Sequence, residues 1–137
     1  MSKLIKMSIL ILLLSLNLFG CKKEPVALPI ESDVKNISLS KNIENEKVPT
    51  IISNDKEINH IIKSIQLGSK KTNKESHNDT PTNVNHYIKI KFYFFDGGAS
   101  VAYLYKKRDN NYIEQPYNGI WKITPESYDN IIGLLNM

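Results

Sequence analysis

Cys21 has the most distinctive chemistry in this sequence, because it is the only cysteine among 137 residues. Its sulfur can form a thioether with a lipid, whereas a disulfide within the chain would need a second thiol. A chain that carries no other thiol suits an oxidising compartment outside the cytoplasm. Without a disulfide, the folded chain must depend on a hydrophobic core.

The residues before Cys21 are arranged as a secretory signal. Lys3 and Lys6 form a short positive region, and the mainly apolar segment 7–19 follows them. That segment is shorter than the roughly 20 apolar residues that a membrane-spanning helix needs. The charged residues directly after Cys21 also argue against a buried core helix. We therefore expect an export signal over residues 1–20.

The run Leu18-Phe19-Gly20-Cys21 looks like a lipobox, the cleavage and lipidation signal of bacterial lipoproteins. Gly20 supplies the small side chain that the signal peptidase requires, while Phe19 is larger than the usual residue at its position. We expect cleavage between Gly20 and Cys21. A diacylglyceryl group on Cys21 would then anchor the chain to the extracytoplasmic face of the cell membrane.

Groups that could hold a metal or act as nucleophiles are few. His77 and Asp79 share the polar segment 69–85, and His86 follows it. Two imidazoles and a carboxylate could contribute to a zinc site, but their spacing matches no known ligand motif. Ser76 precedes His77, yet neighbours in sequence rarely face one another and no nucleophile elbow surrounds them. We expect no metal and no cofactor.

Glu114 is the carboxylate that lies between aromatic residues, Tyr112 and Tyr117. Glycan hydrolysis uses a pair of carboxyl groups, one of which has a raised pKa in an apolar pocket. Glu114 is thus the candidate acid. The alternative is a cross-strand ion pair with a lysine such as Lys122. We expect that alternative, no catalytic residues and no enzymatic activity.

The elements that would position these groups begin with a helix predicted over residues 55–67. Asn54 can cap it, and Gly68 can end it as a left-handed residue. His60 lies beside the apolar stripe and is expected to face solvent. The stripe has the helical spacing i, i+3, i+4 and i+7, with Ile58, Ile61, Ile62 and Ile65.

Alternating residues predict a β-meander after this helix. Strands are expected over 86–95, 112–117 and 120–123, the last two joined by a type I′ turn at Asn118-Gly119. A two-residue loop at Gly97-Gly98 would pair Phe92 with Tyr103. This register puts Tyr93, Phe95, Ala102 and Leu104 on one face with Lys89 and Lys91.

Two further segments complete the predicted architecture. Residues 34–40 show a weak alternation that predicts a first strand. The segment 48–52 contains Pro49, which favours an edge strand or an extended lead-in. Thr124-Pro125 begins a last helix with its own apolar stripe. The fold class is α+β: an antiparallel β-meander of three to four strands, plus the weak N-terminal strand, with two helices packed on one face.

The domain organisation follows from these boundaries. Residues 1–20 are the signal peptide, 21–33 carry the lipidated cysteine and a flexible tether, and 34–137 form a single small domain. Loss of the signal lowers the formal charge from +4 to about +2. So little charge, outside the cytoplasm, gives no basis for nucleic-acid binding.

The run from Tyr112 to Trp121, Tyr-Ile-Glu-Gln-Pro-Tyr-Asn-Gly-Ile-Trp, resembles a signature of small lipoproteins from Gram-positive bacteria. The segment 72–81 is similar to a second pattern of the same family, with Thr, Ser, Asp and Pro at matching spacings. Trp121 stands where the family pattern has tyrosine. The resemblance covers about residues 34–137 and the lipobox, implies a domain of unknown function, and supplies no catalytic residues.

These observations predict a membrane-anchored binding module, whose partner would be a protein, a peptide or a wall-associated ligand. The alternatives are a small cell-wall or peptide-processing enzyme that uses Glu114 or the His77 and Asp79 loop, and a passive structural or immunity-type lipoprotein. A deep pocket at these residues would favour the enzyme, and a flat aromatic face would favour binding. The expected binding surface comprises Tyr93, Phe95, Leu104, Tyr112, Glu114, Gln115, Pro116, Tyr117 and Trp121.

Overall fold

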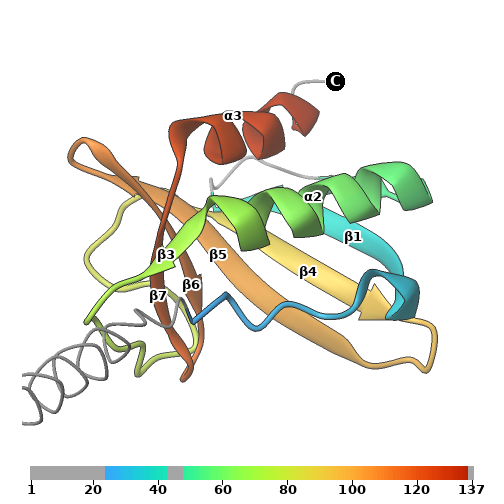
Figure 1. The fold of residues 1–137 in the computed structure, drawn as a ribbon, viewed down its shortest axis with the longest axis horizontal. Coiled ribbons are helices and arrows are strands. Elements are labelled where there is room, and N and C mark those ends of the chain that lie inside the picture. Colours follow the sequence, from blue (N-terminus) through green and yellow to red (C-terminus); the bar gives the residue numbers. More distant parts are fainter. Residues whose placement is uncertain (1–23, 43–47, 136–137) are drawn as a thin grey trace, which may run out of the picture.

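The computed structural model describes residues 24–42 and 48–135, in which a seven-stranded antiparallel sheet carries two helices on one face (Figure 1). The strand order is β2-β1-β4-β5-β6-β7-β3. The α+β class is confirmed, with more strands than predicted. The elements are η2 (Glu31–Asp33), β1 (Val34–Lys41), β2 (Thr50–Ile52), α2 (Asp55–Gly68), β3 (Ser69–Lys71), β4 (Ile88–Phe94), β5 (Ala99–Lys107), β6 (Asn110–Gln115), β7 (Gly119–Ile123) and α3 (Pro125–Leu134).

The first of these helices, α2, begins where its cap predicts. The Asn54 side chain accepts hydrogen bonds from the backbone N–H groups of Lys56, at 3.0 Å, and Glu57, at 3.3 Å. All four isoleucines of the apolar stripe are buried against the sheet. Gly68 is the last helical residue and not the predicted left-handed one. Its role is steric, since a Cβ there would lie 2.1 Å from Ser127 Oγ of α3.

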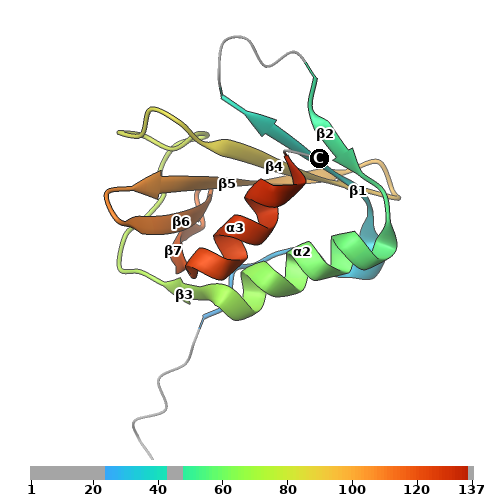
Figure 2. The ribbon, with the colours of Figure 1, turned by 90° about the horizontal axis from the view of Figure 1, so that it is seen from above.

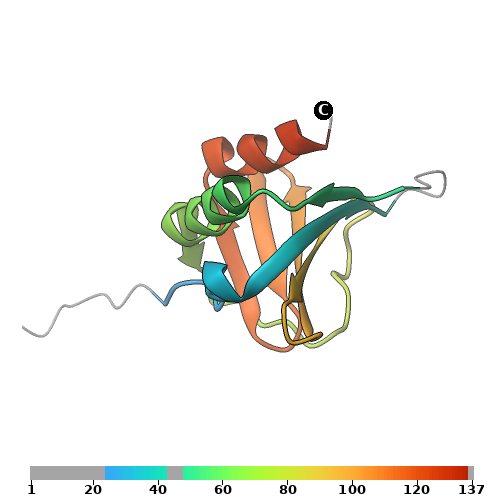
Figure 3. The same ribbon diagram turned by 90° about the vertical axis from the view of Figure 1, so that its right-hand side faces the viewer.

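The second helix, α3, packs beside α2 (Figure 2). Thr124 Oγ1 accepts a hydrogen bond from Ser127 N at 3.3 Å, and Pro125 occupies the first turn, as predicted. Ser127 Oγ donates to the backbone oxygen of Ser64 at 2.9 Å, which ties the two helices together. Figure 3 shows both helices on the same face of the sheet.

The predicted register between β4 and β5 is wrong by three residues, because Phe92 lies opposite Ser100 and not Tyr103. The loop has three residues, 95–97, and it closes with a 2.9 Å hydrogen bond from Phe94 N to Gly98 O. Gly97 takes the left-handed conformation, with φ 93°. An odd shift exchanges the two faces of a strand. Ala102 and Leu104 therefore face the helices and are 0% exposed.

The β6–β7 connection also differs from the predicted type I′ turn. Gln115 pairs with Gly119, so the loop is 116–118, and Tyr117 takes the left-handed conformation with φ 60°. In β1, a bulge between Val34 and Asn36 breaks the alternation, so Val34 and Ile37 are both buried. β2 lies at the sheet edge, as Pro49 predicts.

The segment 24–33 contacts the domain at several points, whereas the sequence predicts a flexible tether over residues 21–33. Val26 is 2% exposed and belongs to the hydrophobic core. The backbone oxygen of Glu24 accepts a 2.9 Å hydrogen bond from Trp121 Nε1, and that of Ala27 accepts one of 2.8 Å from Gln115 Nε2. The predicted signal peptide and the lipobox, with Gly20 and Cys21, lie outside the described residues.

Candidate functional site

The face of the sheet turned away from the helices carries a group of aromatic side chains that we call the tyrosine face, defined as Tyr87, Tyr103, Tyr105, Tyr112 and Glu114. Strand pairing places Tyr103 opposite Glu114 and Tyr105 opposite Tyr112. Tyr105 and Tyr112 stack, with ring centroids 5.7 Å apart and an interplanar angle of 28°. Tyr87 meets Tyr103 edge to face at 5.2 Å. Aromatic pairs of these geometries stabilise one another beyond their buried area.

Glu114 is held by two hydroxyl groups at the centre of this face. Its Oε1 accepts a hydrogen bond of 2.7 Å from Ser76 Oγ, and its Oε2 accepts one of 3.0 Å from Tyr105 OH. Only 6% of the residue is exposed. Burial, followed by the nearby Glu114 carboxylate, raises the pKa of Tyr105, so its hydroxyl keeps the proton that it donates.

The predicted ion pair between Glu114 and Lys122 is wrong. Lys122 lies opposite Tyr112, two positions along β7 from Ile120, the residue that lies opposite Glu114. The two side chains lie on the same face but not opposite one another, and both Glu114 oxygens accept hydrogen bonds from hydroxyl groups instead. Glu114 could be singled out from sequence, but its hydrogen-bond donor Ser76 could not. Ser76 lies 38 residues away in a polar segment with no periodic pattern.

The segment between β3 and β4 covers part of the tyrosine face and leaves an open cavity of about 400 Å³ beside it. Figure 1 shows this segment in yellow-green beside β6 and β7. Lys74 extends over the Tyr112 ring, with Nζ 4.9 Å from the centroid. The other lining residues are Glu75, His77, Asn78, Thr82, Asn83, Tyr105, Lys107, Glu114 and Ile120. The cavity thus combines aromatic walls, two lysines and an oriented carboxylate.

Three residues of the predicted binding surface are buried and do not belong to it. Leu104 faces the helices because of the register shift. Trp121, 1% exposed, faces the core and donates a hydrogen bond to the backbone oxygen of Glu24. Gln115, 7% exposed, donates one to the backbone oxygen of Ala27. These two roles could not be predicted from sequence, because residues 24–27 carry no regular pattern.

The remaining predicted surface residues are spread over three places. Tyr93 is half-buried on the same face as the tyrosines, with Lys91 Nζ 4.6 Å from its ring centroid. Phe95 lies in the β4–β5 loop and is 69% exposed. Pro116 and Tyr117 lie in the β6–β7 loop. These loop residues, Phe95, Pro116 and Tyr117, do not share one surface with Tyr112 and Glu114.

The groups considered for zinc are not assembled into a site. His77 Nε2 lies 3.1 Å from Glu75, whereas Asp79 accepts a hydrogen bond from Tyr117 OH at 3.0 Å. Within residues 24–42 and 48–135, no three metal-ligating side chains come together. The same residues contain no helix that is long and apolar enough to cross a membrane.

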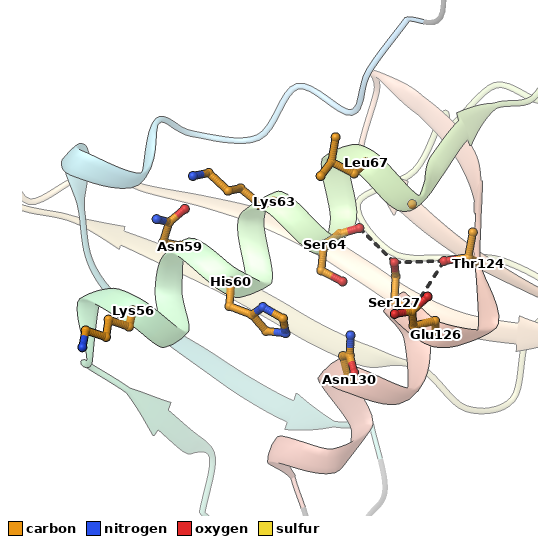
Figure 4. A pocket seen from close by; sticks show the side chains of 11 residues that line it. Lys56, Asn59, His60, Lys63, Ser64, Leu67, Thr124, Glu126, Ser127 and Asn130 are labelled. Atoms are coloured by element: carbon orange, nitrogen blue, oxygen red, sulfur yellow. Dashed lines mark hydrogen bonds between the residues drawn. The ribbon is translucent and has the colours of Figure 1, made fainter.

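A groove of about 610 Å³ lies between α2 and α3 (Figure 4). His60 lines it and is exposed, as expected. The polar groups at one end, Ser64 O, Ser127 and Thr124, are hydrogen-bonded to one another (Figure 4). They serve helix packing, so the tyrosine face is the better candidate site.

Comparison with known proteins gives a family and a fold. A family model described as "Domain of unknown function (DUF5300)" matches residues 22–122. The NMR structure of a protein from Ruminococcus gnavus is similar, with a TM-score of 0.57 and 28% identity. The likeness covers 73% of this chain and 95% of that one. No curated protein matches the chain.

Proposed function

Since this chain belongs to the family described as "Domain of unknown function (DUF5300)", we propose its function from the site: a membrane-anchored, extracytoplasmic binding module without enzymatic activity. Its ligand, a peptide or a wall-associated molecule, would occupy the cavity beside the tyrosine face. The proposed location at the membrane depends on the lipobox-like run that ends at Cys21. The family match, over residues 22–122, covers the part of the chain after that cysteine.

The binding proposal rests on the hydrogen bonds that Glu114 makes. A general acid or base must exchange a proton with its substrate. Both Glu114 oxygens instead accept hydrogen bonds from protein hydroxyls, which orders the Ser76 segment over the sheet. Around it, tyrosine rings and the amines of Lys74 and Lys107 offer stacking and charge to a ligand.

One observation favours the enzymatic alternative. Glu114 and His77, which come from distant parts of the chain, line the same cavity. If a ligand displaced Ser76, the carboxylate and the imidazole would both face it. The two functions therefore predict different products from the same cavity, namely an unaltered ligand or a hydrolysed one.

A titration with defined wall fragments tests the proposal. Peptidoglycan stem peptides and disaccharide-peptides are added to the chain without its signal, and binding is followed by calorimetry and by NMR shifts of the tyrosine face. We expect binding that Tyr112→Ala weakens about tenfold, corresponding to about 1.4 kcal/mol. Leu67→Ala, at a position 87% exposed on α2, is the matched control and should bind normally.

The same mixtures distinguish the alternatives. Cleaved fragments that disappear with Glu114→Gln would contradict the binding proposal and favour the enzyme. If the native chain neither binds nor cleaves any fragment, partner proteins or a passive structural or immunity-type role would replace the proposed wall ligand.

A further inference from the structure

We propose that the end of the domain at which the N-terminal segment begins lies against the membrane surface and contacts anionic lipid headgroups. This end, here called the exit end, comprises Lys71, Asn73, Lys74, Tyr117 and Asn118. The inference extends the proposed function and depends on lipidation of Cys21.

The first support is the fixed position of Glu24. Its backbone oxygen is bonded to Trp121 Nε1 at 2.9 Å, and its carboxylate forms an ion pair with Lys71. Two residues further on, Val26 is part of the hydrophobic core. The chain is therefore attached to the domain from Glu24 onwards, and the flexible spacer predicted from Cys21 to residue 33 has no equivalent in residues 24–33.

The second support is the short distance that remains. Only Lys22 and Lys23 separate Cys21 from Glu24. Three extended residues span roughly 11 Å. An acylated Cys21 lies at the membrane interface, whose polar layer is itself several ångströms thick. Glu24 must then lie close to the headgroups, and so must the side chains beside it.

The third support is the position of the β6–β7 loop beside Glu24. Lys71, the ion-pair partner of Glu24, has its Cε 3.6 Å from where a Cβ on Gly119 would stand. The loop preceding Gly119 carries Tyr117, which is 68% exposed. In Figure 1, α3 lies at the top and the blue N-terminal segment runs below α2, so the exit end and α3 lie at different ends of the domain.

The exit end has the chemistry of an interfacial contact. A hollow of about 400 Å³ is lined by Lys71, Lys74 and neutral polar groups. The carboxylate in its lining, Glu75, lies 3.1 Å from His77 Nε2. Basic residues near an anionic membrane surface are attracted to it, and tyrosine favours the interface between water and lipid.

Tyr117 is held outward at a conformational cost. Its φ of 60° is unfavourable for a bulky side chain, and its hydroxyl donates to Asp79 at 3.0 Å. Strained residues persist where the surrounding structure requires them, and they cluster at active sites, ligand clamps and switch regions. An exposed aromatic ring fixed in this way fits a headgroup layer.

Site-specific fluorescence on the lipidated protein tests this orientation. Because the sulfur of acylated Cys21 is blocked, each introduced cysteine is the one reactive thiol. Asn73→Cys and Tyr117→Cys report on the exit end, and Asn130→Cys on α3 is the matched control. In vesicles that contain phosphatidylglycerol and a headgroup-attached quencher, we expect quenching at the first two sites to exceed that at the control at least threefold.

The possible results separate the orientation from the anchor. Acylated protein that floats with the vesicles but shows equal quenching at all three sites would overturn the orientation and leave the anchor intact. Protein that lacks the acyl mass and does not float would overturn both. Quenching at Asn73 keeps the test valid if Tyr117→Cys alters the loop, and native Trp121 fluorescence verifies the fold of each variant.

Discussion

Ser76 and Glu114 lie 38 residues apart in sequence, and their side chains meet in a 2.7 Å hydrogen bond beneath the surface. The contact links the segment between β3 and β4 to the middle of β6. Because it joins a hydroxyl to a buried carboxylate, it belongs to the stronger class of hydrogen bonds. The hydrogen bond therefore fixes one point of that segment over the tyrosine face.

Tyr105→Phe should lower the free energy of unfolding by about 1.5–3 kcal/mol, because it removes a hydrogen bond to the buried Glu114 carboxylate. Urea denaturation measures the loss. The matched control is Tyr117→Phe, which removes the exposed hydrogen bond to Asp79 and should change stability by no more than about 0.5 kcal/mol. Equal effects would show that Glu114 does not depend on Tyr105.

Gly68→Ala should destabilise the protein by about 1–3 kcal/mol, although alanine is the better helix former. The added Cβ would lie 2.1 Å from Ser127 Oγ and force α2 and α3 apart. Gly133→Ala in α3 is the control, since a Cβ there meets nothing within 4 Å. It should stabilise by about 0.5–1 kcal/mol. Thermal denaturation of both variants reveals the opposite signs, and a stabilising Gly68→Ala would contradict the close helix contact.

Acid should loosen the N-terminal segment. The hydrogen bond from Lys71, and then its charge, lowers the pKa of Glu24 below its usual value of about 4.3. The ion pair therefore contributes fully above that value, and its contribution is lost as pH falls through the lower pKa of the folded state. We expect Trp121 fluorescence to be constant from pH 7 to 5 and to change below about pH 4.3.

Glu24→Gln is the control for this titration, because glutamine has no carboxyl group to protonate. The variant should lack the component of the fluorescence change that arises from Glu24. An identical acid transition in both proteins would assign the change to other groups.

Cys21→Ser should abolish acylation and release the chain from the membrane fraction or stall its processing. The reason is that serine cannot form the thioether that carries the lipid. Fractionation and mass spectrometry of the N-terminal peptide measure both effects. Continued membrane retention of a cleaved Cys21→Ser product would contradict the lipid anchor.

The two helices could be predicted from sequence because their signals are local. Asn54 and Thr124 cap their own helices, and the isoleucine stripe of α2 can be recognised without knowing which surface it packs against. The register of β4 and β5 could not be predicted in this way. Gly97-Gly98 is compatible with a two-residue loop or with the three-residue loop 95–97, and the choice reverses the faces of β5.

The candidate site was predictable only in part, because most of its contacts join residues that are distant in sequence. Glu114 stands out between aromatic residues, but its hydrogen-bond donors depend on contacts distant in sequence. β3 was missed because Ser69–Lys71 has no apolar residue, and its pairing with β7 supplies the only reason for its extended form. Docking of residues 24–27 likewise depends on Trp121 and Gln115, which lie far along the chain.

The two edges of the sheet have a consequence for self-association. Each edge strand, β2 and β3, has only three residues. Pro49 precedes one of them, and Lys70 and Lys71 occupy the other. Short, charged or proline-flanked edges discourage strand pairing between molecules. Many copies could therefore crowd together on one surface without joining their sheets into aggregates.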